Sequence, residues 1–383
     1  MKRVLMMVTV LITLIVLPFP VQAAALTVAG KSSLLMDVTT GTVLQESNAH
    51  EKLAPASVTK VMTMLLIMEA VDSGKISMTD TVTASEAAAA KGGSQIYLKV
   101  GETMSVSDML KSIAVSSAND CACAMAEHIA GSEEAFVAQM NQRAKELGMN
   151  DTNFVNCTGL DDGANGADHK TSAYDIALMS RELLKNHPDI KKFTTIWMDT
   201  VRNGTFGLSN TNKLVRFYQG ATGLKTGFTS GAGYCLSASA ARDGLELIAV
   251  VMGAETSQKR FADCKGMLDY GFANYALIQP ELESGPAEVP VVLGKEESVS
   301  AKLGEAAPIV IDKGQRPGVT MQAQLEPTVT APVSRGQRLG TLTVRAGEQV
   351  LAQIPLVAAQ EVAKLTWGDL FVEVLQRTAM AKR

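Results

Sequence analysis

The chain of 383 residues lacks the features of several common protein classes. It has no long basic stretch and its formal charge is −4, so we expect no nucleic-acid partner. Its four histidines are scattered and show no H-E-x-x-H spacing. We therefore expect neither a metal site nor a cofactor.

Cysteine is also scarce, and five cysteines cannot form a complete disulfide framework. Cys121 and Cys123 are two residues apart, so on a helix they would point to different sides. That spacing suits neither a disulfide nor a tetrahedral metal site. We expect the thiols to be small buried side chains.

The N-terminus has the order of a secretory signal peptide. Lys2 and Arg3 precede an almost wholly apolar run at residues 4–17, then Pro18 and Pro20, then small residues at 23–25. The alternative is an uncleaved membrane anchor, but the run is short for a span and ends in prolines. We expect residues 1–25 to be removed and the protein to be exported to an extracytoplasmic or periplasmic location.

The pattern of residues 26–278 predicts one mixed domain. Strand-like runs occur at 33–38, 42–45, 224–226, 234–241 and 245–252, and helical runs at 57–71, 109–129 with a break near 116–119, 133–147, 173–185 and 258–276. Strands at both ends with helices between them favour an α/β (α+β) fold, in which helices flank an antiparallel sheet.

A second, smaller domain follows a linker that contains Pro280 and Pro286. Residues 286–362 are rich in Val, Thr and Gly, which predicts a β-sandwich with a hairpin at 339–344 and 349–357. Residues 363–383 predict an amphipathic helix whose apolar stripe is Trp367, Leu370, Phe371, Val374 and Leu375. We expect this tail to rest on the outer face of the cytoplasmic membrane, the alternative being a helix packed on the sandwich.

Three short motifs carry the chemistry of the first domain. They are an S-x-x-K from Ser57 to Lys60, an S-x-N from Ser117 to Asn119, and a K-T-G from Lys225 to Gly227. Each of the first two is weak alone. The ordered set behind a signal peptide is much more specific, and it is the signature of penicillin-binding proteins and serine β-lactamases.

Ser57 and Lys60 have the spacing of a nucleophile and its base, because residues three apart share one helix face. A neutral lysine could remove the serine proton if burial and a nearby positive Lys225 lowered its pKa. The alternatives are an N-cap serine and a solvated helix lysine.

The other two motifs suit substrate binding. Ser117 could relay a proton, and Asn119 could hydrogen-bond a peptide, although both residue types also cap helices. Lys225 and Thr226 could bind a carboxylate at a strand edge, and Gly227 would permit close backbone approach. The alternative is an ordinary edge strand protected by a lysine.

Beyond the motifs, the chain from about residue 26 to its end resembles low-molecular-mass penicillin-binding proteins that are serine-type D-alanyl-D-alanine carboxypeptidases. The supporting stretches are residues 54–60, 117–120, 223–229, 232–234 and 268–272. The resemblance implies a transpeptidase-like domain, peptidoglycan stem peptides ending in D-Ala-D-Ala as substrate, and covalent binding of β-lactam antibiotics.

The resemblance also implies roles for single residues. Ser57 would be acylated, Lys60 would be its base, and the backbone N–H groups of Ser57 and Phe228 would form the oxyanion hole. Arg260 would help to fix the terminal carboxylate, unless it is an exposed helix arginine. Some relatives carry His where this chain has Phe228, so the backbone role carries over there but a side-chain contact to substrate does not.

Two other functions share these motifs. A class A β-lactamase needs an additional glutamate, and we find no glutamate in an E-x-x-x-N setting between Ser117 and Lys225. Such an enzyme would also have no use for the sandwich and the tail. An inactive wall-binding scaffold is the second alternative, although all catalytic residue types are present.

Overall fold

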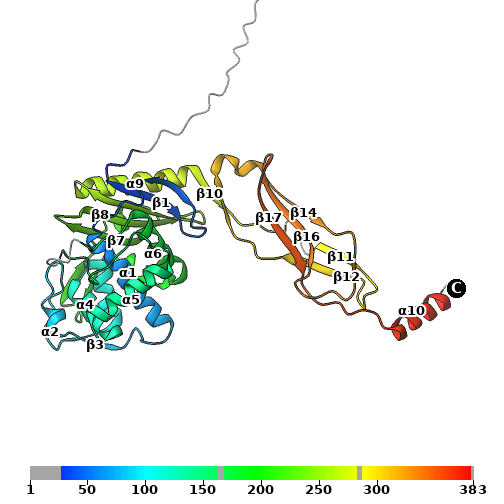
Figure 1. The fold of residues 1–383 in the computed structure, drawn as a ribbon, viewed down its shortest axis with the longest axis horizontal. Helices are drawn as coiled ribbons and strands as arrows, with labels where there is room; N and C mark the ends of the chain where they lie inside the picture. The colour runs from blue at the N-terminus through cyan, green and yellow to red at the C-terminus, as the bar shows by residue number, and fades with distance from the viewer. Residues whose placement is uncertain (1–26, 162–167, 283–286, 381–383) are drawn as a thin grey trace, which may run out of the picture.

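The computed structural model describes residues 27–161, 168–282 and 287–380. The expected signal peptide at 1–25 lies outside these residues, as does most of the loop at 159–168. Figure 1 shows a helix-rich domain joined to an elongated β-domain, with the last helix at the far end of the β-domain.

A five-stranded antiparallel sheet forms the centre of the first domain, with the order β2-β1-β9-β8-β7. Its strands are β1 (Ser32–Asp37), β2 (Val43–Ser47), β7 (Ala221–Thr229), β8 (Gly233–Arg242) and β9 (Leu245–Ala254). Strands from the two ends of the domain pair in the middle, as β1 lies beside β9. This confirms the predicted antiparallel sheet and places β7 at one edge.

Helices cover both faces of this sheet (Figure 1). One face packs against α9 (Ser257–Asn274), with Leu236, Ala238 and Leu247 in the shared core. The other faces the larger cluster, formed by α1 (Lys60–Asp72), α3 (Val106–Ser116), α4 (Asn119–Ala130), α5 (Glu133–Glu146) and α6 (Ala173–Asn186). Helix α1 is apolar almost all round, so it can be stable only at the centre of this cluster.

Four of these helices, and the short helix α2 (Glu86–Ala89), follow a cap residue whose hydroxyl accepts the backbone N–H three positions later. The caps are Ser85, Ser105, Ser132, Ser172 and Thr256. Helix α1 differs, because it continues from the 3₁₀ helix η1 (Ala56–Thr59) and has no side-chain cap. The Ser57 hydroxyl is therefore not used as a helix cap, so the alternative that Ser57 is only an N-cap serine is excluded.

Short elements connect these parts. They are β3 (Thr81–Thr83), α2 (Glu86–Ala89), β4 (Thr103–Ser105), η3 (Pro188–Ile190), α7 (Lys191–Thr194), β5 (Met198–Val201), β6 (Phe206–Ser209) and α8 (Leu214–Phe217). Strands β3 and β4 form one small antiparallel pair, and β5 and β6 form another.

The second domain is all-β, as predicted. A six-stranded sheet has the order β14-β16-β17-β12-β11-β15, and Val289, Leu342 and Leu356 lie in its core. Its strands are β11 (Ala287–Val292), β12 (Ser298–Leu303), β14 (Val319–Leu325), β15 (Val329–Thr330), β16 (Arg338–Ala346) and β17 (Gln349–Ala358). The 3₁₀ helix η4 (Lys313–Gly318) precedes β14.

A strand pair joins the two domains where the sequence indicated only a linker. Helix α9 ends at Asn274 rather than at 276, because β10 (Tyr275–Ile278) pairs with β13 (Ile309–Asp312). The boundary between the domains is thus fixed by backbone hydrogen bonds in addition to the covalent connection.

The tail begins later than predicted. Residues 363–365 are bound to the β-domain by two backbone hydrogen bonds. The Lys295 N–H donates to Ala363 O at 2.8 Å, and the Leu365 N–H donates to Leu293 O at 2.9 Å. Helix α10 (Trp367–Met380) therefore starts only at Trp367. No helix among the described residues is long and apolar enough to cross a bilayer.

Candidate active site

Lys60 and Ser57 meet where η1 passes into α1. The Lys60 side chain is fully buried, and its Nζ donates to Ser57 Oγ at 2.9 Å and to the carbonyl oxygen of Thr158 at 2.8 Å. Burial lowers the pKa of Lys60 to about 7. The solvated helix lysine is thereby excluded, and a neutral amine is available at the serine hydroxyl near neutral pH.

Lys225 contributes to the site from β7, and its side chain is also fully buried. Its pKa lies well below the usual value, because of burial first and then because of repulsion by the positive charge of Lys60. Nζ donates to the carbonyl oxygen of its neighbour Thr226 at 2.9 Å. Lys225 therefore does not protect an exposed edge, which excludes the ordinary-edge-strand alternative.

The S-x-N motif lies at the break between α3 and α4. Ser117 has a φ of 61° in the left-handed region and is buried. Asn119 donates its Nδ2 to Gly92 O at 2.7 Å, whereas its buried Oδ1 has no partner among the described residues. Neither side chain caps α4, since its N-cap is Ala118 without a side-chain hydrogen bond. The amide oxygen of Asn119 is therefore an unused hydrogen-bond acceptor among the described residues.

Gly227 lies against the segment that carries the serine. A Cβ atom at this position would be 2.7 Å from Pro55 O, closer than real Cβ atoms approach, and 3.0 Å from Ser57 N, which is tighter than most real Cβ contacts. Strand β7 thus passes directly beside the Ser57 amide. The adjacent Phe228 is exposed and its ring stacks on Tyr234 with 4.2 Å between centroids.

Arg260 of α9 hydrogen-bonds to the backbone of β7. It is only 8% exposed, so the exposed-helix alternative is wrong. Its Nη1 donates to Gly227 O at 2.8 Å and to Cys235 O at 3.2 Å. Thr226, the remaining member of the motif, donates its hydroxyl to Thr211 Oγ1 at 2.7 Å.

The loop that closes over Lys60 was not expected from the sequence. Asn156 Oδ1 accepts the N–H groups of Thr158 at 3.1 Å and Gly159 at 2.7 Å, and this turn aims the Thr158 carbonyl at Lys60. Asp120 was not expected either, and its carboxylate accepts the N–H groups of Ile96 and Leu98 beside the S-x-N motif. For the loop, the available signal in the sequence was Asn156, a residue type that often starts a turn, three positions before Gly159.

The cysteines fit the expectation from sequence, whereas a cluster of two glutamates and a histidine was not expected. All five thiols are buried and free, as predicted. Glu69, Glu182 and His187 gather within 4.8 Å of one another. The guanidinium of Arg143 binds Glu69 at 2.7 Å and Glu182 at 2.6 Å, so the positive charge at this cluster comes from the protein itself.

Comparison with known proteins decides among the functions that share this geometry. Residues 20–256 match the family model described as D-alanyl-D-alanine carboxypeptidase, and residues 282–364 match the C-terminal domain of penicillin-binding protein 5. The chain belongs to the D-alanyl-D-alanine carboxypeptidase family. It is a serine-type peptidase, and the β-lactamase and inactive-scaffold alternatives are set aside.

Similar proteins span nearly the whole chain. The D-alanyl-D-alanine carboxypeptidase DacF of Bacillus subtilis is 44% identical over 99% of this chain and 98% of its own. The structure of penicillin-binding protein 5 from Haemophilus influenzae is 31% identical with a TM-score of 0.75, covering 88% of this chain and 98% of that one. Penicillin-binding protein D2 of Listeria monocytogenes, solved with ampicillin bound, is 33% identical with a TM-score of 0.59, covering 64% and 99%.

If Lys60 is the base of Ser57, as expected from the sequence, its pKa predicts the pH dependence of acylation. A neutral amine can accept the Ser57 proton and a charged one cannot, so the acylation rate should rise as pH increases through about 7 and then level off. Lys60→Arg keeps the charge without a removable proton, and acylation should fall about 10²–10⁴-fold at every pH. Stopped-flow measurement with a fluorescent penicillin from pH 5 to 9 checks both, and a rate that fell with rising pH would contradict the assignment.

The contact at Gly227 makes a second prediction. Gly227→Ala should push β7 away from Ser57, costing about 1–3 kcal/mol of folding free energy and slowing acylation on the order of 10²-fold. The matched control is Gly231→Ala in the following turn, where a Cβ would meet Asp161 Oδ2 at an ordinary 3.4 Å. Thermal unfolding and acylation rates of both variants test this, and equal behaviour of the two would refute the close approach.

Proposed function

We propose that Ser57 is the nucleophile of this carboxypeptidase and Lys60 its general base. The single observation that supports this most strongly is the 2.9 Å contact between Ser57 Oγ and the buried Nζ of Lys60. The serine oxygen would attack the carbonyl carbon between the last two D-alanines while the Lys60 amine takes its proton. The C–N bond then breaks, the terminal D-alanine leaves with a proton, and water later hydrolyses the Ser57 ester.

Strand β7 would bind the substrate as an extended peptide along its open edge. Asn119 Oδ1 would accept a peptide N–H, and the N–H groups of Ser57 and Phe228 would bind the oxygen that becomes negative. The terminal carboxylate would bind beside Lys225 and Arg260, and the Thr226 hydroxyl would turn from Thr211 to donate to it. Ser117 would carry protons between the lysines and the leaving group.

The substrate would be the peptidoglycan stem peptide ending in D-Ala-D-Ala, and β-lactams would acylate the same serine. Residues 1–25 would direct export, so that the enzyme acts outside the cytoplasm. The domain division would follow the predicted boundaries at 26–278 and 286–362, with residues 20–256 and 282–364 matching two separate family models.

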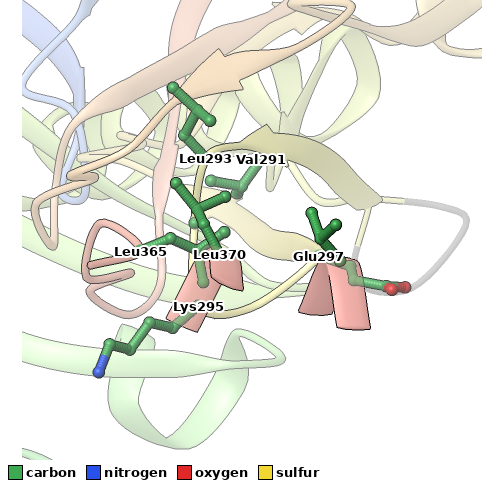
Figure 2. A pocket seen from close by; sticks show the side chains of 8 residues that line it. Val291, Leu293, Lys295, Glu297, Leu365 and Leu370 are labelled. Atoms are coloured by element: carbon green, nitrogen blue, oxygen red, sulfur yellow. The ribbon is translucent and has the colours of Figure 1, made fainter. Parts of the chain in front are cut away.

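Helix α10 would attach the enzyme to the outer face of the membrane. Trp367 is 89% exposed and Phe371 66% exposed, whereas Leu370 faces a groove of about 540 Å³ that Val291 and Leu293 also line. Figure 2 shows Leu370 directed toward these side chains. The predicted stripe therefore divides, because Leu370 and Val374 line this groove whereas Trp367 and Phe371 are exposed and would be available for lipid.

Penicillin tests the nucleophile. Intact-mass spectrometry should show one drug molecule added per chain, and Ser57→Ala should remove the adduct and the release of D-alanine from an L-Lys-D-Ala-D-Ala peptide. A peptide ending in L-Ala should be refused. An adduct that persisted in Ser57→Ala, or equal cleavage of the L-terminated peptide, would contradict the proposal.

Truncation after Thr366 tests the tail, because it retains the extended residues bound to Leu293 and Lys295. The mature truncated protein should move from the membrane fraction to the soluble fraction with peptide hydrolysis nearly unchanged. Phe371→Glu should weaken binding to anionic vesicles without lowering the melting temperature, whereas Leu370→Ala should mainly lower the melting temperature. The membrane role fails if Phe371→Glu destabilises the fold and leaves vesicle binding intact.

A further inference from the structure

The residue before Ser57 has an unusual backbone conformation, and this residue leads into the peptide unit that ends at the Ser57 N–H. Ala56 has a φ of 48°, in the left-handed region that residues with a side chain rarely adopt. The N–H of this peptide unit is the Ser57 N–H, one of the two proposed oxyanion-hole donors. Because a trans peptide is planar, its C=O and N–H point in opposite directions, and whatever fixes the Ala56 carbonyl also fixes the Ser57 N–H.

Thr59 fixes this carbonyl. Its buried hydroxyl donates to Ala56 O at 2.8 Å and contacts His169 Nε2, also at 2.8 Å. The other ring nitrogen of His169 accepts the Val155 N–H at 3.1 Å. A backbone N–H can only donate, so Nδ1 carries no proton and Nε2–H must donate to Thr59. The hydrogen bonds therefore run in one direction, from Val155 through His169 and Thr59 to Ala56.

The surroundings protect this chain of hydrogen bonds. A Cβ on Gly159 would lie 1.8 Å from Ala56 O and 2.7 Å from Thr59 Oγ1, so the loop backbone covers the carbonyl closely. His169 is 3% exposed, and burial lowers its pKa to about 4. The ring is thus neutral at the pH where Lys60 is deprotonated, and it keeps the single tautomer that the chain requires.

We propose that His169 and Thr59 are positioning residues that aim and polarise the Ser57 N–H for the oxyanion hole. The inference rests on the proposed role of Ser57. A hydrogen bond to the Ala56 oxygen draws electron density from the amide, which strengthens its N–H as a donor. Neither residue contacts the reacting atoms, so both act through the Ser57 peptide alone.

Thr63 provides a matched control one helical turn further along α1. Its buried hydroxyl also donates to a backbone carbonyl at 2.6 Å, in this case Cys157 O in the loop that contains Thr158 and Gly159. Thr59→Val and Thr63→Val therefore remove the same kind of hydrogen bond, a buried hydroxyl to a backbone carbonyl, from the continuous segment that η1 and α1 form. Only the first removes one that reaches the Ser57 peptide.

The test combines acylation kinetics with infrared spectroscopy of the penicilloyl ester on the full chain. Thr59→Val should slow acylation about 10–100-fold and raise the stretching frequency of the ester carbonyl, because a misdirected donor polarises it less. Thr59→Ser retains the hydroxyl and should restore both values. Thr63→Val should leave the ester frequency at its wild-type position whatever its effect on stability.

His169 variants give a second route if Thr59→Val does not fold. His169→Ala should raise the ester frequency, and His169→Gln, which can both accept and donate, should raise it less. A wild-type ester frequency in folded Thr59→Val, or in folded His169→Ala, would overturn the inference. Failure of the proposed nucleophile would instead appear as the absence of any ester in the wild-type protein.

Discussion

The buried amine of Lys60 is the constraint on which the rest of the site depends. A charged ammonium in this position would cost several kcal/mol, so the folded chain favours the neutral form and supplies Thr158 O and Ser57 Oγ as its partners. Such burial is possible only because α1 is enclosed on all sides by other helices and the sheet. The apolar character of α1 would therefore serve the proposed base Lys60 as much as stability.

The sequence predicted the fold class, the antiparallel sheet and the break that carries Ser117, because these depend on hydrophobic periodicity and local helix breaks. It also predicted that Ser57 and Lys60 share a face. It could not predict the Thr158 carbonyl or the chain from His169 to Ala56, because a backbone carbonyl has no side-chain signature and His169 is 110 residues from Thr59. Contacts between distant segments follow from tertiary packing alone.

Lys225 and Arg260 show a second limit of sequence reasoning. Both were expected at the substrate, yet Lys225 is fully buried and the Nη1 group of Arg260 binds the backbone of β7 and β8. In this part of β7 consecutive residues are buried on both faces of the sheet, so alternation cannot show which way a side chain points. Their influence on a bound carboxylate would then come largely through electrostatic potential at short range.

Local backbone strain links two of the three motifs. Ala56 immediately precedes Ser57, and Ser117 opens the S-x-N motif, and both have a φ near +50° to +60° without being glycine. Each such conformation costs of order 1–3 kcal/mol and persists only where neighbouring contacts determine it. At Ala56 those contacts are the Thr59 hydroxyl and the Gly159 backbone. Ser117 is constrained by the two helices beside it, because it is the C-cap of α3 and α4 begins two residues later. Relaxing either turn would rotate a motif away from Lys60 and β7, so the packing energy of the helical cluster is partly used to keep both serines in place.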